Sequence, residues 1–388
     1  MADRSVRSGW ILTHLVRAGA GAVLPGPVFR WALMSATSAE AGGTSVIVMS
    51  CLAFVANAAD GTVTTFSLDD DAVLRRQAVS EIGPGCSSLV VDAERRQLHA
   101  SVKGDPPAIV TCRIDDDGRL VPVSRRQVES SVSYLALSPD GGTMLAASYG
   151  GGFGISMPVD DAGVGEVVSR IDHPHMHSCA VGPDGRTAYF VSLGADLIVQ
   201  CALDGATLTP LDPPTAPAPA GSGPRHLVLT RDGAHVYVMT EFSGDVLHYS
   251  RSDQGILALV GQAAAFAPDR GLSHSRLGAD PIAGHLIWGA DLHLSLDERT
   301  CWASERSEST LATLRIDADG TPHPAERFTP AEKQPRGFAV SPDGRYLLCA
   351  GEKSTTVSLF RITADGGLAA SGQVETGRGA NWVRFLSA

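Results

Sequence analysis

A small set of charged side chains recurs at equivalent places of a repeated sequence pattern. Each copy has an apolar segment, a turn similar to Ser-Pro-Asp-Gly, and a second apolar segment. Three copies carry a charged or titratable residue seven positions before the turn aspartate, namely His177, Arg225 and Arg336. Two copies carry one about nine positions after it, namely Glu241 and Arg306. Guanidinium groups bind carboxylates and phosphates, and the ordinary pKa of an imidazole lies near neutrality. Together these residue types suit the binding of an anion and the transfer of a proton.

The same two positions in the other copies are small or polar. They hold Gly85, Ser133 and Ala290 before the turn, and Tyr149, followed by three glycines, and Glu352 after it. A polar, water-filled channel would account for one isolated arginine. Three arginines would repel one another unless anions compensate them. Glu241 can be one such anion, and a bound substrate another.

A histidine-rich segment offers an alternative chemistry. The sequence His-Pro-His-Met-His-Ser places His173, His175 and His177 at alternate positions, and three imidazoles on one side of a strand would suit zinc. Pro174 indicates a loop at the start, and only His177 occupies the repeated position. We therefore expect no metal and no cofactor, with His177 as a general acid or base. The glycine run 150–152 leads into no helix, and no Gly-x-Ser-x-Gly motif is present, which argues against a phosphate loop and a nucleophilic serine.

The turn aspartates define the repeat that must position these residues. They are Asp92, Asp140, Asp184, Asp232, Asp297 and Asp343, at intervals of 44 to 48 residues except for one interval of 65. This spacing is close to the roughly 40 to 50 residues of a four-stranded propeller blade. Because the first two strands of a blade form a hairpin, both charged positions lie at one mouth of the central channel. The long interval predicts a loop between about Ala263 and Leu286.

Strand patterns near the two ends of the chain complete a seventh blade. Residues 52–56 and 63–68 have strand patterns, and residues 381–386 have the pattern of a first strand without its second. Pairing them covers strand edges that would otherwise be exposed. We therefore predict an all-β, seven-bladed β-propeller of four-stranded antiparallel blades, closed by the C-terminal strand joining the N-terminal blade. A β-sandwich with many Asp-Gly hairpins is the alternative.

Composition limits the remaining possibilities. The 388 residues carry a formal charge of -11, which argues against a broad nucleic-acid or anionic-membrane surface. The seven cysteines form no Cys-x-x-Cys pair, so we expect them to pack in the core. Residues 1–44 lack the repeat and contain no apolar stretch long enough to span a bilayer, so we predict a poorly structured extension before a propeller over 45–388. A signal peptide is the alternative; we expect a cytoplasmic protein without nucleic-acid or membrane partners.

At these residues the chain resembles the lactonase-type β-propeller family, which contains bacterial 6-phosphogluconolactonases and fungal carboxy-cis,cis-muconate cyclases. The matching segments are SYGGG at Ser148, HMHSCAVGPDG at His175, GSGPRHLVLTRDG at Gly221, VYVMTE ending at Glu241, WGADLHLSLDE at Trp288, SERSESTL at Ser304, QPRGFAVSPDGRYLLCAGEKS at Gln334 and GRGANWV at Gly377. The resemblance covers the chain from about Val46 onward. Two departures stand out, because Lys103 stands where arginine can occur and Glu352 where glutamine is common.

The resemblance implies a metal-free site that binds an anionic substrate and moves a proton. It suggests His177, Arg225, Glu241 and Arg306 as catalytic residues, supported by Arg336, Asp291 and His293. We also expect His175, His226, Tyr149 and Glu352 to contribute to substrate binding.

Three functions are compatible with this sequence. The first is a lactonase that hydrolyses the ester of an anionic, sugar-type lactone similar to 6-phosphogluconolactone. The second is a cycloisomerase of the carboxy-cis,cis-muconate type, which forms a lactone from a polycarboxylate. The third is a propeller that binds a partner without catalysis, which predicts an apolar patch rather than converging charges. We expect the first, with a small anionic lactone or polycarboxylate as the ligand.

Overall fold

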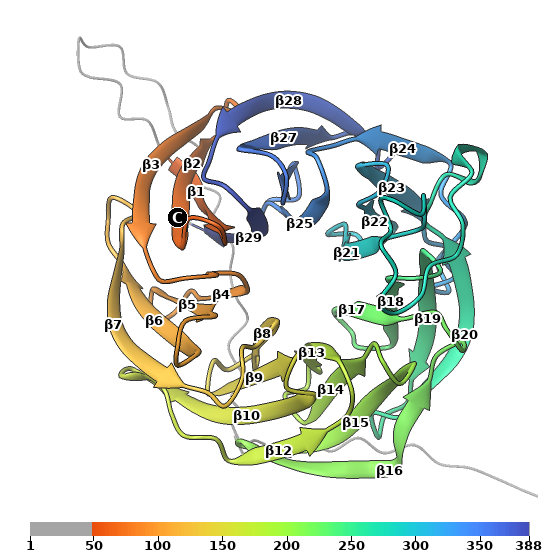
Figure 1. Cartoon of the computed structure of the whole chain (residues 1–388), viewed down its shortest axis with the longest axis horizontal. Helices are drawn as coiled ribbons and strands as arrows, with labels where there is room; N and C mark the ends of the chain where they lie inside the picture. The colour runs from red at the N-terminus through yellow and green to blue at the C-terminus, as the bar shows by residue number, and fades with distance from the viewer. Residues whose placement is uncertain (1–48, 388) are drawn as a thin grey trace, which may run out of the picture. The chain divides into compact units, whose positions relative to one another are not determined.

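The computed structural model describes residues 49–387, and these form seven antiparallel sheets arranged in a ring around a central channel (Figure 1). Six sheets have four strands, and the third gains a short fifth strand, β11 (Gly163–Val164), beside β10 (Phe153–Asp160). The predicted seven-bladed β-propeller is therefore confirmed. The chain divides into two units, Met1–Val46 and Ile47–Ala388, and the predicted extension over residues 1–44 lies outside the described residues.

Each blade is a four-stranded meander that runs from the channel to the rim. The innermost strands are β29 (Ala380–Ser387), β4 (Leu89–Asp92), β8 (Tyr134–Leu137), β13 (Met176–Val181), β17 (Pro224–Leu229), β21 (Gly289–Leu294) and β25 (Pro335–Val340). The second strands are β1 (Met49–Asn57), β5 (Gln97–Val102), β9 (Thr143–Ser148), β14 (Thr187–Ser192), β18 (His235–Thr240), β22 (Thr300–Glu305) and β26 (Tyr346–Gly351). The third strands are β2 (Thr62–Asp69), β6 (Ala108–Ile114), β10, β15 (Leu197–Asp204), β19 (Asp245–Arg251), β23 (Thr310–Arg315) and β27 (Thr356–Ile362). The outer strands are β3 (Leu74–Glu81), β7 (Leu120–Gln127), β12 (Ser169–Asp172), β16 (Thr207–Pro217), β20 (Leu257–Ala264), β24 (Arg327–Pro330) and β28 (Leu368–Glu375).

The two ends of the described chain share one blade. Strand β29 pairs antiparallel with β1, so that Ala53 lies opposite Phe385 and Val55 opposite Val383. The pairing covers the inner edge of β1 and closes the ring, as the sequence predicts.

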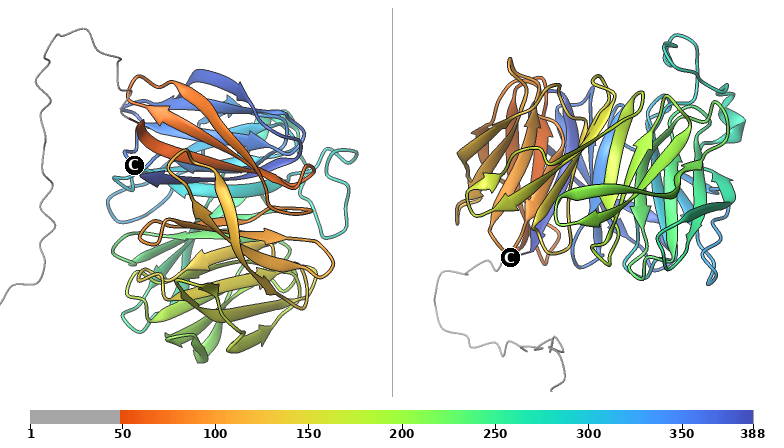
Figure 2. Two further views of the ribbon diagram at one scale, coloured as in Figure 1. Left: turned by 90° about the vertical axis from the view of Figure 1, so that its left-hand side faces the viewer. Right: turned by 90° about the horizontal axis from the view of Figure 1, so that it is seen from below.

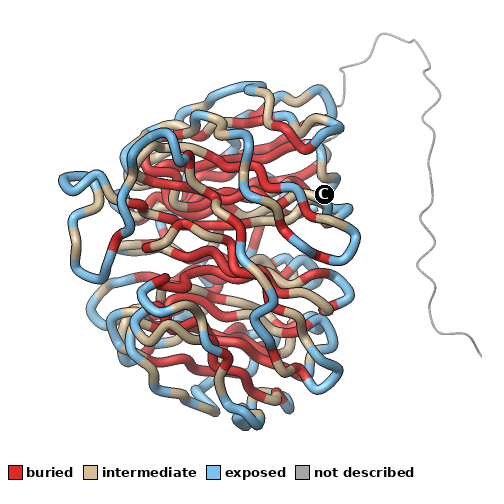
Figure 3. Tube along the Cα trace, turned by 90° about the vertical axis from the view of Figure 1, so that its right-hand side faces the viewer, coloured by how far each residue is buried: buried red, intermediate tan, exposed pale blue. Residues whose placement is uncertain are grey.

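The apolar core lies between the blades. Seven clusters of buried residues each draw on two neighbouring blades, for example Trp302 and Leu311 against Phe338 and Leu347. The buried stretches follow mainly the second and third strands of the blades, and the exposed ones lie at turns and along outer strands such as β7 and β28 (Figure 3). All seven cysteines are buried.

The hairpin turns between first and second strands use one repeated device. The carboxylate of Asp140 accepts hydrogen bonds from Ser138 Oγ at 2.5 Å and from the backbone N–H of Gly142 at 3.0 Å. The residue after the aspartate has positive φ, 66° at Gly141 and 59° at Glu298. Glycine suits this conformation without steric cost, which accounts for the recurrent Asp-Gly pair.

A β-bulge near the start of five inner strands directs the functional side chains. In β13 the pairing with β14 shifts between Met176 and Ser178, so that His177 is the extra residue. The same shift leaves Arg225 extra in β17, Arg336 in β25 and Asn381 in β29, and in β21 it places Ala290 and Asp291 opposite Ser304 alone. A bulge bends its strand and re-aims a side chain. The bulges thus occur at the positions where charged residues recur in the sequence.

The long interval between turn aspartates is a loop between β20 and β21. It contains the short 3-10 helix η1 (Pro268–Arg270) and a bridge between Ser273 and Leu286. Both ends of the loop lie at the channel mouth that carries the bulges, because Ala264 pairs with Asp245 and β21 begins at Gly289. The loop projects beyond one face of the ring (Figure 2). No helix within residues 49–387 is long and apolar enough to span a membrane.

Candidate active site

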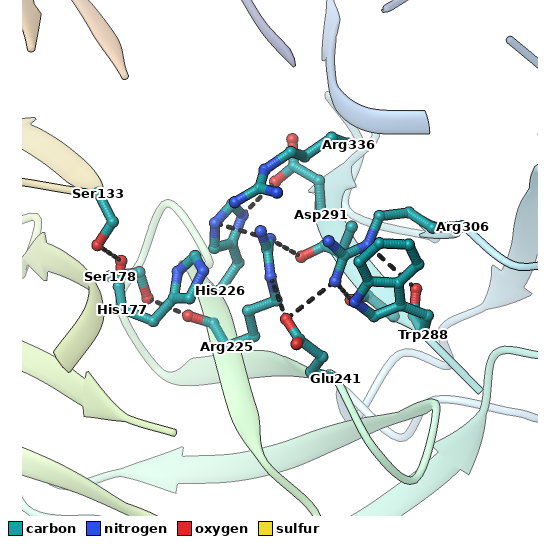
Figure 4. Close-up of polar contacts among 12 residues, drawn as sticks. Ser133, His177, Ser178, Arg225, His226, Glu241, Trp288, Asp291, Arg306 and Arg336 are labelled. Atoms are coloured by element: carbon teal, nitrogen blue, oxygen red, sulfur yellow. Dashed lines mark hydrogen bonds and ion pairs between the residues drawn. The ribbon is translucent and has the colours of Figure 1, made fainter. Parts of the chain in front are cut away.

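Two buried arginines and one glutamate from adjacent blades form the centre of the mouth (Figure 4). Arg225 Nε donates to Glu241 Oε2 at 2.8 Å, and Arg306 Nη2 donates to the same oxygen at 2.9 Å. The side chains of Arg225 and Arg306 are 1% and 2% exposed, and that of Glu241 is 18% exposed. Glu241 therefore compensates two guanidinium charges that would otherwise repel each other.

Backbone carbonyls and a tryptophan hold the two guanidinium groups in place. Arg225 Nη1 donates to Ala290 O at 2.6 Å, and Arg306 Nη2 donates to Gly289 O at 2.9 Å. The Arg306 guanidinium also stacks on the Trp288 ring, 3.9 Å from its centroid. Within residues 49–387, Arg225 Nη2 and Arg306 Nη1 have no hydrogen-bond acceptor. These two nitrogens are thus available to an anion.

His226 is held as a neutral imidazole in one tautomer. Arg225 Nη1 lies 3.0 Å from His226 Nε2, and a guanidinium can only donate, so Nε2 must accept. His226 Nδ1 then carries the proton and donates to Asp291 Oδ1 at 2.7 Å. Burial, followed by the charge of Arg225, lowers the pKa of His226 to about 3. Although burial acts to raise the pKa of Asp291, His293 and His226 hold it well below its ordinary value.

His177 lies beside this network and keeps a free nitrogen. Its ring contacts His226 at a centroid distance of 5.1 Å and Tyr149 at 5.8 Å. The side chain is buried, and its Nδ1 has no hydrogen-bond partner. Burial, together with Arg225 and the other cations of the mouth, holds the pKa of His177 well below its ordinary value. His177 is therefore neutral at physiological pH and able to accept a proton.

The remaining predicted site residues surround this centre. Arg336 Nη1 donates to Glu352 Oε2 at 3.2 Å, and both side chains are 31% exposed. His293 Nε2 lies 3.4 Å from Asp291 Oδ2. The rings of Tyr149 and His175 are in contact at a centroid distance of 4.6 Å and are tilted by 52° to each other. The structure thus brings every predicted site residue to this end of the channel or to the inner strands just below it.

The histidine-rich segment differs from a regular strand. Strand β13 begins at Met176, and His175 precedes it with a φ of 52°. His173 and His175 therefore do not continue the strand alternation that a zinc site on one side of the strand would need. Within the described residues no group of three His, Cys, Asp or Glu side chains could hold a metal ion.

Two residues that the sequence analysis did not single out organise the mouth. Trp288 carries the stacking contact with Arg306. Glu305 is buried and accepts hydrogen bonds from the backbone N–H groups of Trp288 at 2.8 Å and Glu308 at 2.7 Å. Glu305 thus holds both the end of the loop before β21, at Trp288, and the turn after β22, which contains Arg306 and Glu308. Its position directly before Arg306 is the one signal that could have indicated this role.

The charges of the mouth nearly balance. Burial acts to raise the pKa of Glu241, but Arg306 and Arg225 outweigh it and hold the pKa below its ordinary value. Burial lowers the pKa of Arg225 to about 10 and that of Arg306 to about 9, so both remain protonated at neutral pH. Three arginines thus face the carboxylates of Glu241, Asp291 and Glu352, with the neutral rings of His177 and His226 between them.

Buried histidines make stability dependent on pH. The pKa values of His99 and His248 are lowered to about 4 and that of His226 to about 3, mainly by burial. In the unfolded chain these three histidines bind protons below about pH 6.5, whereas in the folded chain they do so only at about pH 4 or lower. We therefore expect Tm to fall as pH is lowered from 7 to 5, before the carboxylates titrate. His99→Gln removes one such titration and should reduce the fall, measured by calorimetry; a Tm that is constant or rises over this interval would contradict the assignment.

The comparison with known families matches this architecture. A family model described as lactonase, seven-bladed β-propeller, covers residues 51–385. The chain belongs to this lactonase family. Solved structures with the same fold include a periplasmic gluconolactonase from Pseudomonas aeruginosa, with 25% identity, a TM-score of 0.77, and coverage of 87% of this chain and 99% of that one. A candidate 6-phosphogluconolactonase from Bacteroides fragilis is 21% identical, with a TM-score of 0.78 over 89% of this chain and 100% of that one.

Membership in this family supports an enzyme of the lactonase type. A cavity of about 430 Å³ at the other end of the channel is lined largely by apolar residues such as Leu137, Val181 and Leu229.

Proposed function

We propose that this protein hydrolyses the ester of a sugar-type lactone at the mouth that carries Arg225, Glu241, Arg306 and His177. The observation that carries the proposal is the pair of guanidinium nitrogens, Arg225 Nη2 and Arg306 Nη1, which have no acceptor within residues 49–387. Through the ring of His226, which Arg225 contacts, the site also includes the neutral His177, whose Nδ1 has no partner. The names of the similar structures, a gluconolactonase and a candidate 6-phosphogluconolactonase, support the substrate class.

In the proposed reaction, Arg225 and Arg306 stabilise the negative charge that develops on the carbonyl oxygen. Water attacks the lactone carbonyl carbon, and the carbonyl oxygen becomes an oxyanion in the tetrahedral intermediate. Positively charged donors that are already fixed in a buried site stabilise such an oxyanion without reorganisation. The bonds to Glu241, Ala290 and Gly289 fix these donors before substrate arrives.

His177 is the proposed general base and acid. It takes a proton from the attacking water and returns it to the ring oxygen as the bond between that oxygen and the carbonyl carbon breaks, which yields a hydroxy acid. Cations of the mouth are among the causes that lower the pKa of His177. An oxyanion between them offsets that effect, so the basicity of His177 rises as the intermediate forms.

Glu241 is less suited to the role of base. Its Oε2 accepts two charge-assisted hydrogen bonds, and its pKa lies below the ordinary value. The oxygen Oε2 is thus already engaged by both guanidinium groups. We assign to Glu241 the positioning of the two arginines.

An activity panel tests the proposal. We expect purified full-length protein to hydrolyse δ-gluconolactone or its 6-phosphate, followed by acid release at constant pH, with a rate far above spontaneous hydrolysis. The same preparation is assayed spectrophotometrically with 3-carboxy-cis,cis-muconate. Conversion of the muconate without lactone hydrolysis would contradict the proposal and favour the cycloisomerase alternative. Activity on neither class would contradict catalysis by this site.

A further inference from the structure

Buried polar atoms without a partner gather at the mouth. Eight side-chain atoms within the described residues are buried and have no hydrogen bond. Four of them belong to the starts of inner strands or to the loops that lead into them, namely His175 Nδ1, His177 Nδ1, Ser222 Oγ and Asn381 Oδ1. A buried polar group without a partner is energetically costly, so a cluster of such groups marks a place where a ligand or an ordered water supplies the missing bonds.

Asn381 occupies the bulge position of its inner strand. Between β1 and β29 the register shifts so that Ala56 pairs with Trp382 and Asn57 with Ala380, which leaves Asn381 extra. His177, Arg225 and Arg336 are the extra residues of three other inner strands. Asn381 is thus the structural equivalent of three residues of the mouth.

Asn381 also lies next to the strand that carries Arg336. A Cβ atom added at Gly337 would lie 2.5 Å from the backbone oxygen of Asn381, so β25 and β29 approach closely at this point. Asn381 is 7% exposed. Arg336, on the neighbouring inner strand, donates a hydrogen bond to Glu352 and makes none to the Asn381 amide. The amide oxygen therefore lies unsatisfied beside the site.

We propose that Asn381 determines specificity by accepting a hydrogen bond from a hydroxyl group of the lactone. This inference rests on the proposed function. A carbonyl acceptor needs a donor, and a polyhydroxylated lactone offers several whereas an unsubstituted lactone offers none. A site built to bond a hydroxyl discriminates strongly against the analogue that lacks it, because its own polar group is then left unpaired.

The test compares hydroxylated and unsubstituted lactones. The substrates are δ-gluconolactone, or its 6-phosphate if only that is hydrolysed, and δ-valerolactone, measured by turnover or as a competitive inhibitor. For Asn381→Leu we expect KM for the hydroxylated lactone to rise about 10- to 100-fold with kcat changed less. The KM or inhibition constant of δ-valerolactone should stay within about twofold, since this ligand makes no bond to the amide. The KM of Asn381→Ser for the hydroxylated lactone should lie between those of the wild type and Asn381→Leu, because serine keeps a small acceptor.

The control is Thr313→Val, which removes another buried, unpartnered oxygen on β23, away from the channel. This substitution should leave the kinetic constants for both lactones unchanged. Equal losses for both lactones in Asn381→Leu, or no loss for either, would overturn the specificity role. Absence of lactone hydrolysis by the wild-type protein is a different result, because it overturns the proposed function and this inference with it.

Discussion

Arg225→Ala is expected to lower kcat/KM for the lactone about 10²- to 10³-fold, the loss typical of one oxyanion donor. The change removes the free Nη2 and the Nε bond to Glu241, and it leaves His226 Nε2 without its donor. The seven sheets should persist, because the apolar clusters between the blades do not include Arg225. Steady-state kinetics and circular dichroism measure the two effects separately.

A matched control is Arg251→Ala. Arg251 is also a largely buried arginine with a carboxylate partner, since its side chain is 7% exposed and it pairs with Asp184, but it lies on β19 in the outer half of its blade. This variant should lower Tm and leave kcat/KM unchanged. Full activity in Arg225→Ala, or equal losses of activity in both variants, would refute the assignment of Arg225.

His177→Gln is the second change with a large expected effect. It removes the proposed base while keeping a polar side chain of similar size, and we expect kcat to fall about 10²- to 10⁴-fold. Because the pKa of His177 is held well below its ordinary value, wild-type kcat/KM should show no histidine-type loss between pH 8 and 6. Initial rates over this interval check both statements.

The control for His177 is His99→Gln. His99 is likewise buried with a lowered pKa, but it bonds Thr111 within the second blade. Its replacement should leave kcat intact. A His177→Gln enzyme with wild-type kcat would show that another group transfers the proton.

The repeat made the fold and the central arginines predictable. An interval of 44 to 48 residues between turn aspartates indicates the blade, and counting from the aspartate places Arg225, Arg306 and Glu241 at one mouth. The bulges explain why this count succeeds, because the same position is extra in several inner strands.

Other features depend on contacts that no local pattern encodes. The tautomer of His226 is set by Asp291, which is 65 residues away on the next blade. Trp288 follows an irregular loop, and Glu305 acts through backbone N–H groups. Counting back from a turn aspartate could not identify Asn381. Its blade is formed by the two ends of the described chain, and β29 is followed by no turn aspartate. Pro174 indicates a loop at the start of the histidine-rich segment, but only the structure shows that His175, with its positive φ, precedes the strand.

A crystal structure with the hydroxy-acid product, gluconate or its 6-phosphate, tests the central claim most directly. We expect the product carboxylate within about 2.7 to 3.2 Å of Arg225 Nη2 and Arg306 Nη1, with His177 facing the same carbon. Product bound in the apolar cavity at the other end of the channel, beside Val181 and Leu229, or an empty mouth at saturating concentration, would contradict the account.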